Sequence, residues 1–198
     1  MGLQTTGRVI LASASPRRIE LLQQLGLRFE IVTSGVDEDF RGGESPREHV
    51  LRLAEAKAGA VSRLQPDAWV LGADTIVVID GEILGKPGSP AEAVAMMRKL
   101  SGREHRVFTG FSMLSAERGA AVSEAVESSV IFRKLGEDEA AWYAATEEPY
   151  DKAGAYAVQG LGAFFIREIR GSYTNVMGLP LCEVVDVMKK LQILSFSG

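Results

Sequence analysis

Three Ser-Pro pairs, each followed by residues at helical spacing, constrain how this chain can fold. They are Ser15-Pro16, Ser45-Pro46 and Ser89-Pro90. Serine can satisfy the unpaired N–H groups of a helix start, and proline fits the first turn because an N–H there has no partner. Strand-like apolar runs lie before the first start, at Arg8–Ala12, and between the second and third, at Trp69–Leu71. The alternation predicts an α/β fold.

The remaining pattern favours a mixed sheet that is largely connected by hairpins. Asp80-Gly81 follows the strand-like run Ile76–Ile79 and is the strongest short hairpin signal in the chain. Arg106–Arg133 is mostly strand-like, and Ala153–Ile169 is rich in glycine and aromatic residues and is predicted to be extended. Helices are predicted over residues 16–25, 46–64, 90–100 and 137–145, and from Pro180 onward.

Composition places the chain among ordinary globular proteins. Of its 198 residues, 46% are hydrophobic and 24% are charged, which suffices for a core without disulfides or structural metals. We see no internal repeat and no linker, so residues 1–198 are predicted to form a single domain. The net charge is −4, whereas a protein that binds nucleic acid needs a basic face. We therefore expect no nucleic-acid partner.

Location and membrane contact follow from the apolar segments and the single cysteine. No segment approaches the roughly 20 apolar residues of a membrane span, and the N-terminus lacks the apolar stretch of a signal peptide. We therefore expect no membrane partner. Cys182 stands in the apolar run Leu179–Cys182, is interpreted as a small buried residue, and indicates a reducing, cytoplasmic location.

The segment Ser13–Arg18 joins the first predicted strand to the first helix and is a candidate anion site. A helix N-terminus presents unpaired N–H groups and the positive end of the helix dipole. Serine hydroxyls and the guanidinium groups of Arg17 and Arg18 add donors suited to phosphate oxygens. A capped helix with two solvated arginines explains the same residues, and the segment alone slightly favours that interpretation.

Gly72-Ala73-Asp74-Thr75 lies directly after one apolar strand and before another. A carboxylate is costly to bury in such a context unless it is paired, hydrogen-bonded or bound to a metal. Asp74 is therefore a candidate general base or metal ligand. An aspartate that caps a bulge or turn is the alternative.

Further charged residues are weaker candidates. Gly81–Pro87 lacks the spacing of a P-loop, so Lys86 is either a single phosphate-binding cation or a lysine in a turn. Asp37-Glu38-Asp39 offers oxygen ligands for a divalent cation, although such clusters are often only solvated. Lys57 lies among alanines on the second helix and is interpreted as a surface lysine. His49 and His105 show no metal-binding spacing.

Taken together, these segments resemble the Maf family of nucleotide pyrophosphatases. One four-residue motif would be weak, but an ordered series that covers about residues 8 to 182 is specific. The residues that carry the resemblance are Ser13–Arg18, Asp37-Glu38, Lys57, Gly72–Thr75, Gly85–Pro87, Lys152–Tyr156 with Gln159-Gly160, and Gly171–Tyr173 with Asn175–Pro180.

The resemblance implies an elongated mixed sheet with flanking helices and two lobes around a cleft, as in inosine triphosphate pyrophosphatases. It implies cleavage between the α- and β-phosphates of a nucleoside triphosphate with a divalent cation, Mg²⁺ or Mn²⁺, and makes a homodimer plausible. It implies that Asp74 accepts a proton and that Glu38 belongs to the metal site. The implied phosphate-binding and charge-neutralising residues are Ser13, Arg17, Arg18, Lys57 and Lys86.

Three residues favour one branch of this family. Arg17, Thr75 and Gln159 match the specificity set of the branch that acts on dTTP and UTP. Modified pyrimidine nucleotides remain alternative substrates, and a regulatory nucleotide-binding protein that acts in cell-division (septum) arrest is the alternative function. Asp74 favours catalysis, because a carboxylate beside a triphosphate repels it unless a metal intervenes.

Overall fold

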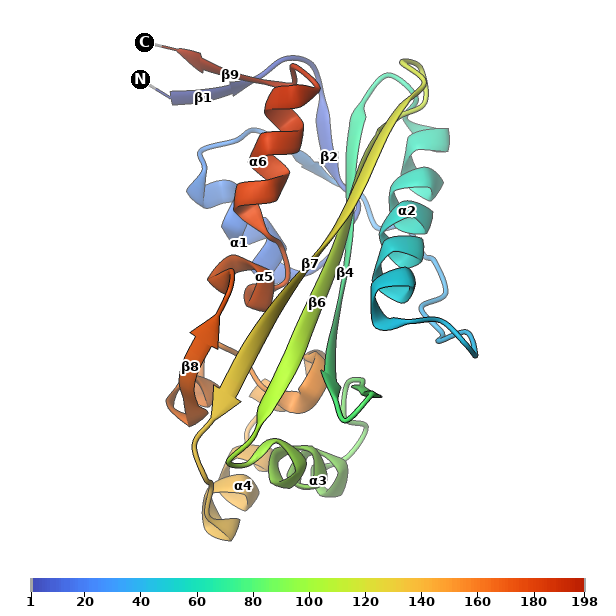
Figure 1. Ribbon diagram of the computed structural model, residues 1–198. Coiled ribbons are helices and arrows are strands. Elements are labelled where there is room, and N and C mark those ends of the chain that lie inside the picture. The colour runs from blue at the N-terminus through green and yellow to red at the C-terminus, as the bar shows by residue number, and fades with distance from the viewer. Residues whose placement is uncertain (1, 198) are drawn as a thin grey trace. The chain divides into compact units, whose positions relative to one another are not determined.

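The computed structural model of the protein describes residues 2–197 (Figure 1). Its contacts divide the chain into two compact units. Unit 1 comprises the chain up to Asp74, the segment Thr109–Val126 and the chain from Gly178 onward. Unit 2 comprises Thr75–Phe108 and Glu127–Met177. That residues 1–198 act as a single domain stays a prediction.

Among the described residues, seven strands form a mixed sheet with the order β3-β2-β4-β6-β7-β8, and β5 pairs with β4. β2 pairs in parallel with β3 and β4, whereas the β4–β5 and β7–β8 pairs are antiparallel. With helices alongside it, this sheet confirms the predicted mixed α/β class. The strands are β2 (Val9–Leu11), β3 (Glu30–Ile31), β4 (Trp69–Ile79), β5 (Glu82–Leu84), β6 (Glu104–Ser115), β7 (Ala120–Phe132) and β8 (Ile166–Arg170).

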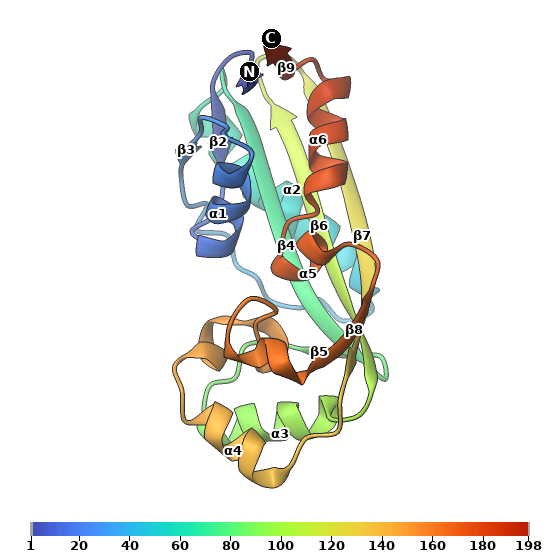
Figure 2. The ribbon, with the colours of Figure 1, turned by 90° about the vertical axis from the view of Figure 1, so that its left-hand side faces the viewer.

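Helices cover both faces of the strands in unit 1 (Figures 1 and 2). α1 (Pro16–Gln24) and α6 (Leu181–Lys190) lie on one face, and α2 (Pro46–Leu64) lies on the other. Within the part of the chain that the structure describes, no helix is both long and apolar enough to cross a membrane. One buried apolar cluster of this unit consists of Ile10, Ala12, Ala58, Val61, Ala68 and Val70.

Two glycines allow α2 to lie unusually close to the sheet. A Cβ atom on Gly72 of β4 would lie 2.3 Å from the carbonyl oxygen of Ala54. A Cβ atom on Gly110 of β6 would lie 2.4 Å from the carbonyl oxygen of Val50. Any side chain at either position would therefore push the helix away from the strands.

The two ends of the described chain pair with each other in unit 1. β1 (Gly2–Thr5) and β9 (Leu194–Ser197) form an antiparallel ladder, in which Gln4 lies opposite Ser195. Figure 1 shows both chain ends at this ladder. The sequence did not predict these strands.

Unit 2 contains the remaining helices and a core of its own. α3 (Pro90–Leu100) and α4 (Glu137–Ala144) pack against each other (Figure 2). Short turns follow them, namely η1 (Glu148–Asp151), η2 (Ala153–Ala155), η3 (Leu161–Phe165) and the five-residue α5 (Tyr173–Met177). The buried core residues include Val77, Leu84, Met97, Leu100, Val107, Val130, Phe132, Tyr143, Tyr156 and Phe165.

The predicted helix starts are confirmed at Pro16, Pro46 and Pro90. At α2 the capping box is complete, since the Glu48 N–H donates to Ser45 Oγ and the Ser45 N–H donates to Glu48 Oε2. At α3 the Glu92 N–H donates to Ser89 Oγ, but the Glu92 carboxylate accepts from the Gly88 N–H. Local sequence therefore fixes where these helices begin.

The Asp80-Gly81 hairpin is also confirmed. Both residues have positive φ, 53° and 78°, and Ile79 lies opposite Glu82 across the turn. Positive φ at both central positions is the geometry of a type I′ turn, which matches the twist of the flanking strands.

Three local predictions are wrong. β4 continues through Gly72–Thr75, so Asp74 lies within a strand and caps no turn there. Ala153–Ile169 contains two short 3₁₀ segments, Ala153–Ala155 and Leu161–Phe165, and a strand begins only at Ile166; Gly154 turns the backbone with a φ of 70°. Cys182 is exposed, because α6 turns Val184 and Val187 toward the core and Cys182 away from it.

His105 lies in the core of unit 2, with 2% of its surface exposed. Its Nε2 atom is 2.8 Å from the Tyr156 hydroxyl, and its ring packs edge-on against Phe132. Burial lowers the pKa of His105 to about 4, because the charged imidazolium would lose its hydration.

We expect the free energy of unfolding to fall as the pH drops from about 6.5 to about 4, because the unfolded chain binds a proton on His105 that the folded chain does not. The contribution of His105 has a slope of at most about 1.4 kcal/mol per pH unit. Urea titrations of the protein and of His105→Gln across this pH range measure this contribution. Because the carboxylates titrate in both proteins, the difference between the two pH dependences belongs to His105. Equal pH dependence in the two proteins would contradict the expectation.

Candidate active site

Lys57 of α2 lies between the carboxylates of Asp74 and Glu38. Its Nζ atom is 2.8 Å from Asp74 Oδ1 and 2.6 Å from Glu38 Oε1. Lys57 and Asp74 are each only 6% exposed, whereas half of the Glu38 side chain is exposed. The prediction of a surface lysine is therefore wrong. The structure brings three sequence-predicted site residues into direct contact within unit 1.

The close approach of α2 explains why Lys57 reaches Asp74. Gly72 and Asp74 are two residues apart on β4, so they face the same side of the strand. Gly72 faces the backbone of Ala54 and Ala58, which flank Lys57 on the inner face of α2. Ala54 and Ala58 thus face the sheet, and Lys57, which lies on the same face of α2, is directed toward β4.

Arg18 of α1 is buried beside these residues. Its Nε atom donates to the Gly178 carbonyl at 2.8 Å, and its Nη1 atom donates to the Ala73 carbonyl at 2.8 Å and to Ser13 Oγ at 3.1 Å. Burial lowers the pKa of Arg18, while the nearby charges of Asp74 and Glu38 raise it. Arg18 therefore fixes the backbone next to Asp74; its role in phosphate binding stays a prediction.

Ser13 shapes the start of α1. Its hydroxyl oxygen accepts from the Ser15 N–H at 3.2 Å as well as from Arg18. Ser15 holds the N-cap position with an extended backbone, and Arg17 is half-buried in the first turn of the helix. The predicted anion site thus combines a helix start, serine hydroxyls and arginines within unit 1.

The other predicted site residues belong to unit 2. Thr75 follows Asp74 on β4 and is half-buried, whereas Lys86 and Gln159 are exposed. The turn that carries Lys86 is held because the Gly154 N–H donates to the Gly85 carbonyl at 3.0 Å. That these residues contribute to the same site stays a prediction.

Glu148 orders the loop that follows Gln159 in unit 2. Its carboxylate accepts from the N–H groups of Leu161 and Gly162, at 2.7 and 2.9 Å, and from the Tyr143 hydroxyl. A Cβ atom on Gly160 would lie 2.0 Å from Glu148 Oε2, which explains the glycine at that position. No local pattern reveals this contact, because thirteen residues separate Glu148 from Leu161.

Two acidic residues of the site carry oxygen atoms of the kind that divalent cations bind. Among residues 2–197, no group of three or more His, Cys, Asp or Glu residues could hold a metal ion by itself. Glu38 and Asp74, however, meet at one ammonium group. Mg²⁺ commonly uses one or two carboxylates together with substrate phosphates and water, so these oxygen donors fit such an ion.

We expect Arg18→Met to lower the free energy of unfolding by about 2–4 kcal/mol, because it leaves the buried carbonyls of Ala73 and Gly178 without their charged donor. Guanidinium titrations measure the change. The control is Arg28→Met, an exposed arginine of the same unit, with an expected change within about 0.5 kcal/mol. Equal effects of the two substitutions would show that the buried contacts contribute little.

Comparisons with known proteins show which family this chain resembles over its length. A family model described as Maf-like protein matches residues 8–191. A protein of Syntrophus aciditrophicus named dTTP/UTP pyrophosphatase is 60% identical, over 98% of this chain and 94% of its own. One of Geotalea uraniireducens with the same name is 50% identical, over 96% of this chain and 97% of its own.

The likeness extends to a solved structure. The Ham1 protein of Staphylococcus aureus matches with a TM-score of 0.52 at 13% identity, over 93% of this chain and 99% of its own. At that identity the match concerns the fold alone, and it agrees with the mixed α/β architecture described above. Because the family model spans nearly the whole sequence and the curated relatives match it over almost their full lengths, this chain belongs to the family of Maf-like proteins.

Proposed function

We propose that this protein hydrolyses dTTP and UTP to the nucleoside monophosphate and pyrophosphate, as a nucleoside triphosphate diphosphatase. The observation that carries the proposal is the buried contact between Lys57 and Asp74 beside Glu38. It occurs in a chain whose relatives at 60% and 50% identity are named dTTP/UTP pyrophosphatase. A fixed carboxylate beside cations is what water-dependent cleavage of a polyanion requires.

In this proposal Asp74 accepts the proton of the attacking water. β4 fixes its backbone, and Lys57 fixes its side chain. Lys57 also offsets part of the charge of the triphosphate. Ser13 and Arg17 bind phosphate oxygens at the start of α1, where the helix dipole favours an anion. Positioning and electrostatic stabilisation of this kind supply most of the catalysis in phosphoryl transfer.

The residues of unit 2 complete the proposal. Lys86 contributes positive charge to the binding of phosphate. Thr75 and Gln159, together with Arg17, select the pyrimidine base. Support comes from the resemblance of these positions to the dTTP- and UTP-specific branch and from the names of the relatives. Modified pyrimidine nucleotides belong to the same proposed substrate class.

The proposal includes a divalent cation, Mg²⁺ or Mn²⁺, for which Glu38 supplies a carboxylate ligand beside Asp74. Bound there, the cation would draw charge from the phosphates and reduce their repulsion by the two carboxylates. A cytoplasmic location, which the single cysteine indicates, and a homodimer, which the family resemblance makes plausible, are further parts of the proposal. The alternative of a regulatory nucleotide-binding protein in septum arrest has weaker support, because a binder has no use for a buried carboxylate beside its anionic ligand.

We expect dTTP and UTP to be turned over at least about tenfold more efficiently in kcat/KM than other nucleoside triphosphates, a difference of about 1.4 kcal/mol. The assay incubates the protein with a nucleotide panel and Mg²⁺ or Mn²⁺, and measures the monophosphate and pyrophosphate released. Binding without turnover of any nucleotide would favour the regulatory alternative.

We expect Asp74→Asn to reduce kcat by about 10²- to 10⁴-fold while the affinity for nucleotide stays within about a factor of ten, because the amide cannot accept the proton. Steady-state kinetics and calorimetric titration with dTTP measure the two effects. Glu55→Gln, which changes an exposed carboxylate on α2, is the matched control and should retain full activity. Near-normal turnover by Asp74→Asn would remove Asp74 from the role of proton acceptor.

A further inference from the structure

The segment that carries Glu38 lacks regular structure. Of the described chain, residues 32–45 between β3 and α2 contain neither helix nor strand. Half of the Glu38 side chain is exposed, yet its carboxylate lies 2.6 Å from Lys57 Nζ. Exposed irregular segments move more than the elements around them unless contacts hold them. Contacts elsewhere in this segment are therefore needed to keep the Glu38 carboxylate beside Lys57.

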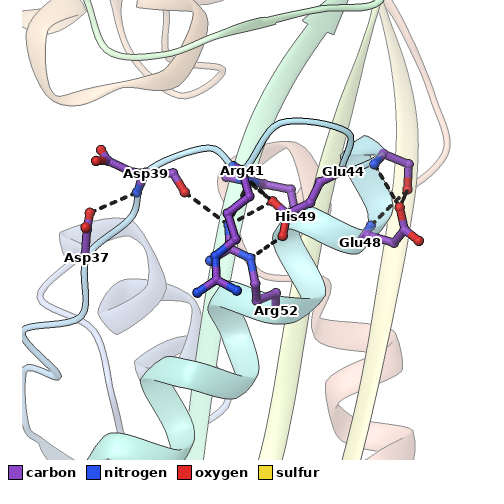
Figure 3. Close-up of polar contacts among 8 residues, drawn as sticks. Asp37, Asp39, Arg41, Glu44, Glu48, His49 and Arg52 are labelled. Atoms are coloured by element: carbon purple, nitrogen blue, oxygen red, sulfur yellow. Dashed lines mark hydrogen bonds and ion pairs between the residues drawn. The ribbon is translucent and has the colours of Figure 1, made fainter.

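Arg52 of α2 supplies such contacts (Figure 3). Its Nη2 atom donates to the carbonyl oxygen of Asp39, the residue after Glu38, at 3.1 Å. The same guanidinium binds the Glu44 carboxylate through Nη2 at 2.8 Å and through a short contact from Nε. One planar fork thus links both ends of the segment 39–44 to the helix that carries Lys57.

His49 and Phe40 strengthen this attachment. The buried His49 ring places Nδ1 3.2 Å from Glu44 Oε2, and the Phe40 ring packs on it at 5.4 Å between centroids. The hydrogen bond from Arg52, followed by that with His49, holds the pKa of Glu44 at about 2. The carboxylate therefore stays charged and paired with Arg52 throughout the neutral range.

We propose that Arg52 is a positioning residue for the reaction, holding the 38–44 segment on α2 so that the Glu38 carboxylate stays beside Lys57. The inference rests on the proposed function. Arg52 and Lys57 are five residues apart on one helix, a rise of about 7.5 Å, so the anchor and the residue it serves move together. Asp39, which follows Glu38 directly, connects the two.

A merely stabilising role for Arg52 predicts something different. In that case Arg52→Met would weaken the fold and reduce activity whether or not Glu38 is present. If Arg52 acts through Glu38, its loss has little further effect once the Glu38 carboxylate is gone. A double-mutant cycle separates the two explanations, because it measures the coupling between the residues.

We expect Arg52→Met to lower kcat/KM for dTTP by about 10- to 100-fold in the otherwise unaltered protein, but by less than about twofold in the Glu38→Ala background. Arg52→Lys, which keeps the charge but lacks the fork, should recover part of the loss. Arg47→Met, an exposed arginine of the same helix, is the control and should behave like the unaltered protein. Urea titrations confirm that every variant is folded at the assay temperature.

Hydrogen exchange of the nucleotide-free protein gives a readout that is independent of activity. Arg52→Met should accelerate exchange of amides in residues 37–44 at least about fivefold and leave exchange in α2 unchanged, whereas Arg47→Met should alter neither. Unchanged exchange in residues 37–44, or equal losses of activity in both backgrounds, would overturn the inference. Absence of turnover by the unaltered protein would instead overturn the proposed function, and with it the role of Arg52 in the reaction.

Discussion

The approach of α2 to the sheet at Gly72 and Gly110 is the constraint on which the site depends. Without a Cβ atom at Gly72, the helix backbone lies directly over β4, and the Lys57 ammonium reaches the Asp74 carboxylate below it. Burying either charge alone would be costly, and their contact offsets much of that cost. The lack of side chains at Gly72 and Gly110 thus allows the ion pair of Lys57 and Asp74 to form between α2 and β4.

Two arginines each hold the backbone next to one of the site carboxylates. Arg18 binds the carbonyl that precedes Asp74, and Arg52 binds the carbonyl that follows Glu38. Each guanidinium also reaches further contacts, Gly178 and Ser13 for Arg18 and Glu44 for Arg52. Arginine suits this task because its planar fork presents several donors at fixed angles. Lysine also has several donors, but they lie on one ammonium at the end of a flexible chain and lack the fixed planar spacing of the guanidinium.

Local signals predicted much of the fold, and contacts distant in sequence account for what they did not predict. The Ser-Pro helix starts and the Asp80-Gly81 turn depend on neighbouring residues only, and they are confirmed. The alanines around Lys57 indicate a surface lysine, because nothing in their spacing shows that Gly72 of a distant strand packs against them. Family resemblance, and not periodicity, first placed Lys57 and Glu38 in the site. Arg52 lacked any signal, since its partners are a loop carbonyl and a carboxylate eight residues away.

The pairing of β1 with β9 has a consequence for how the protein is made. Unit 1 is assembled from the first, middle and last parts of the chain, and Arg18 meets the Gly178 carbonyl 160 residues further on. A ribosome delivers these parts in order, so the N-terminal segment must wait for the C-terminal one before either can complete the unit. The residues around Asp74 are therefore synthesised early and reach their final arrangement only after Gly178 and β9 have been made. Until then the apolar strands β2 and β4 lack part of the cover that they have in the complete unit.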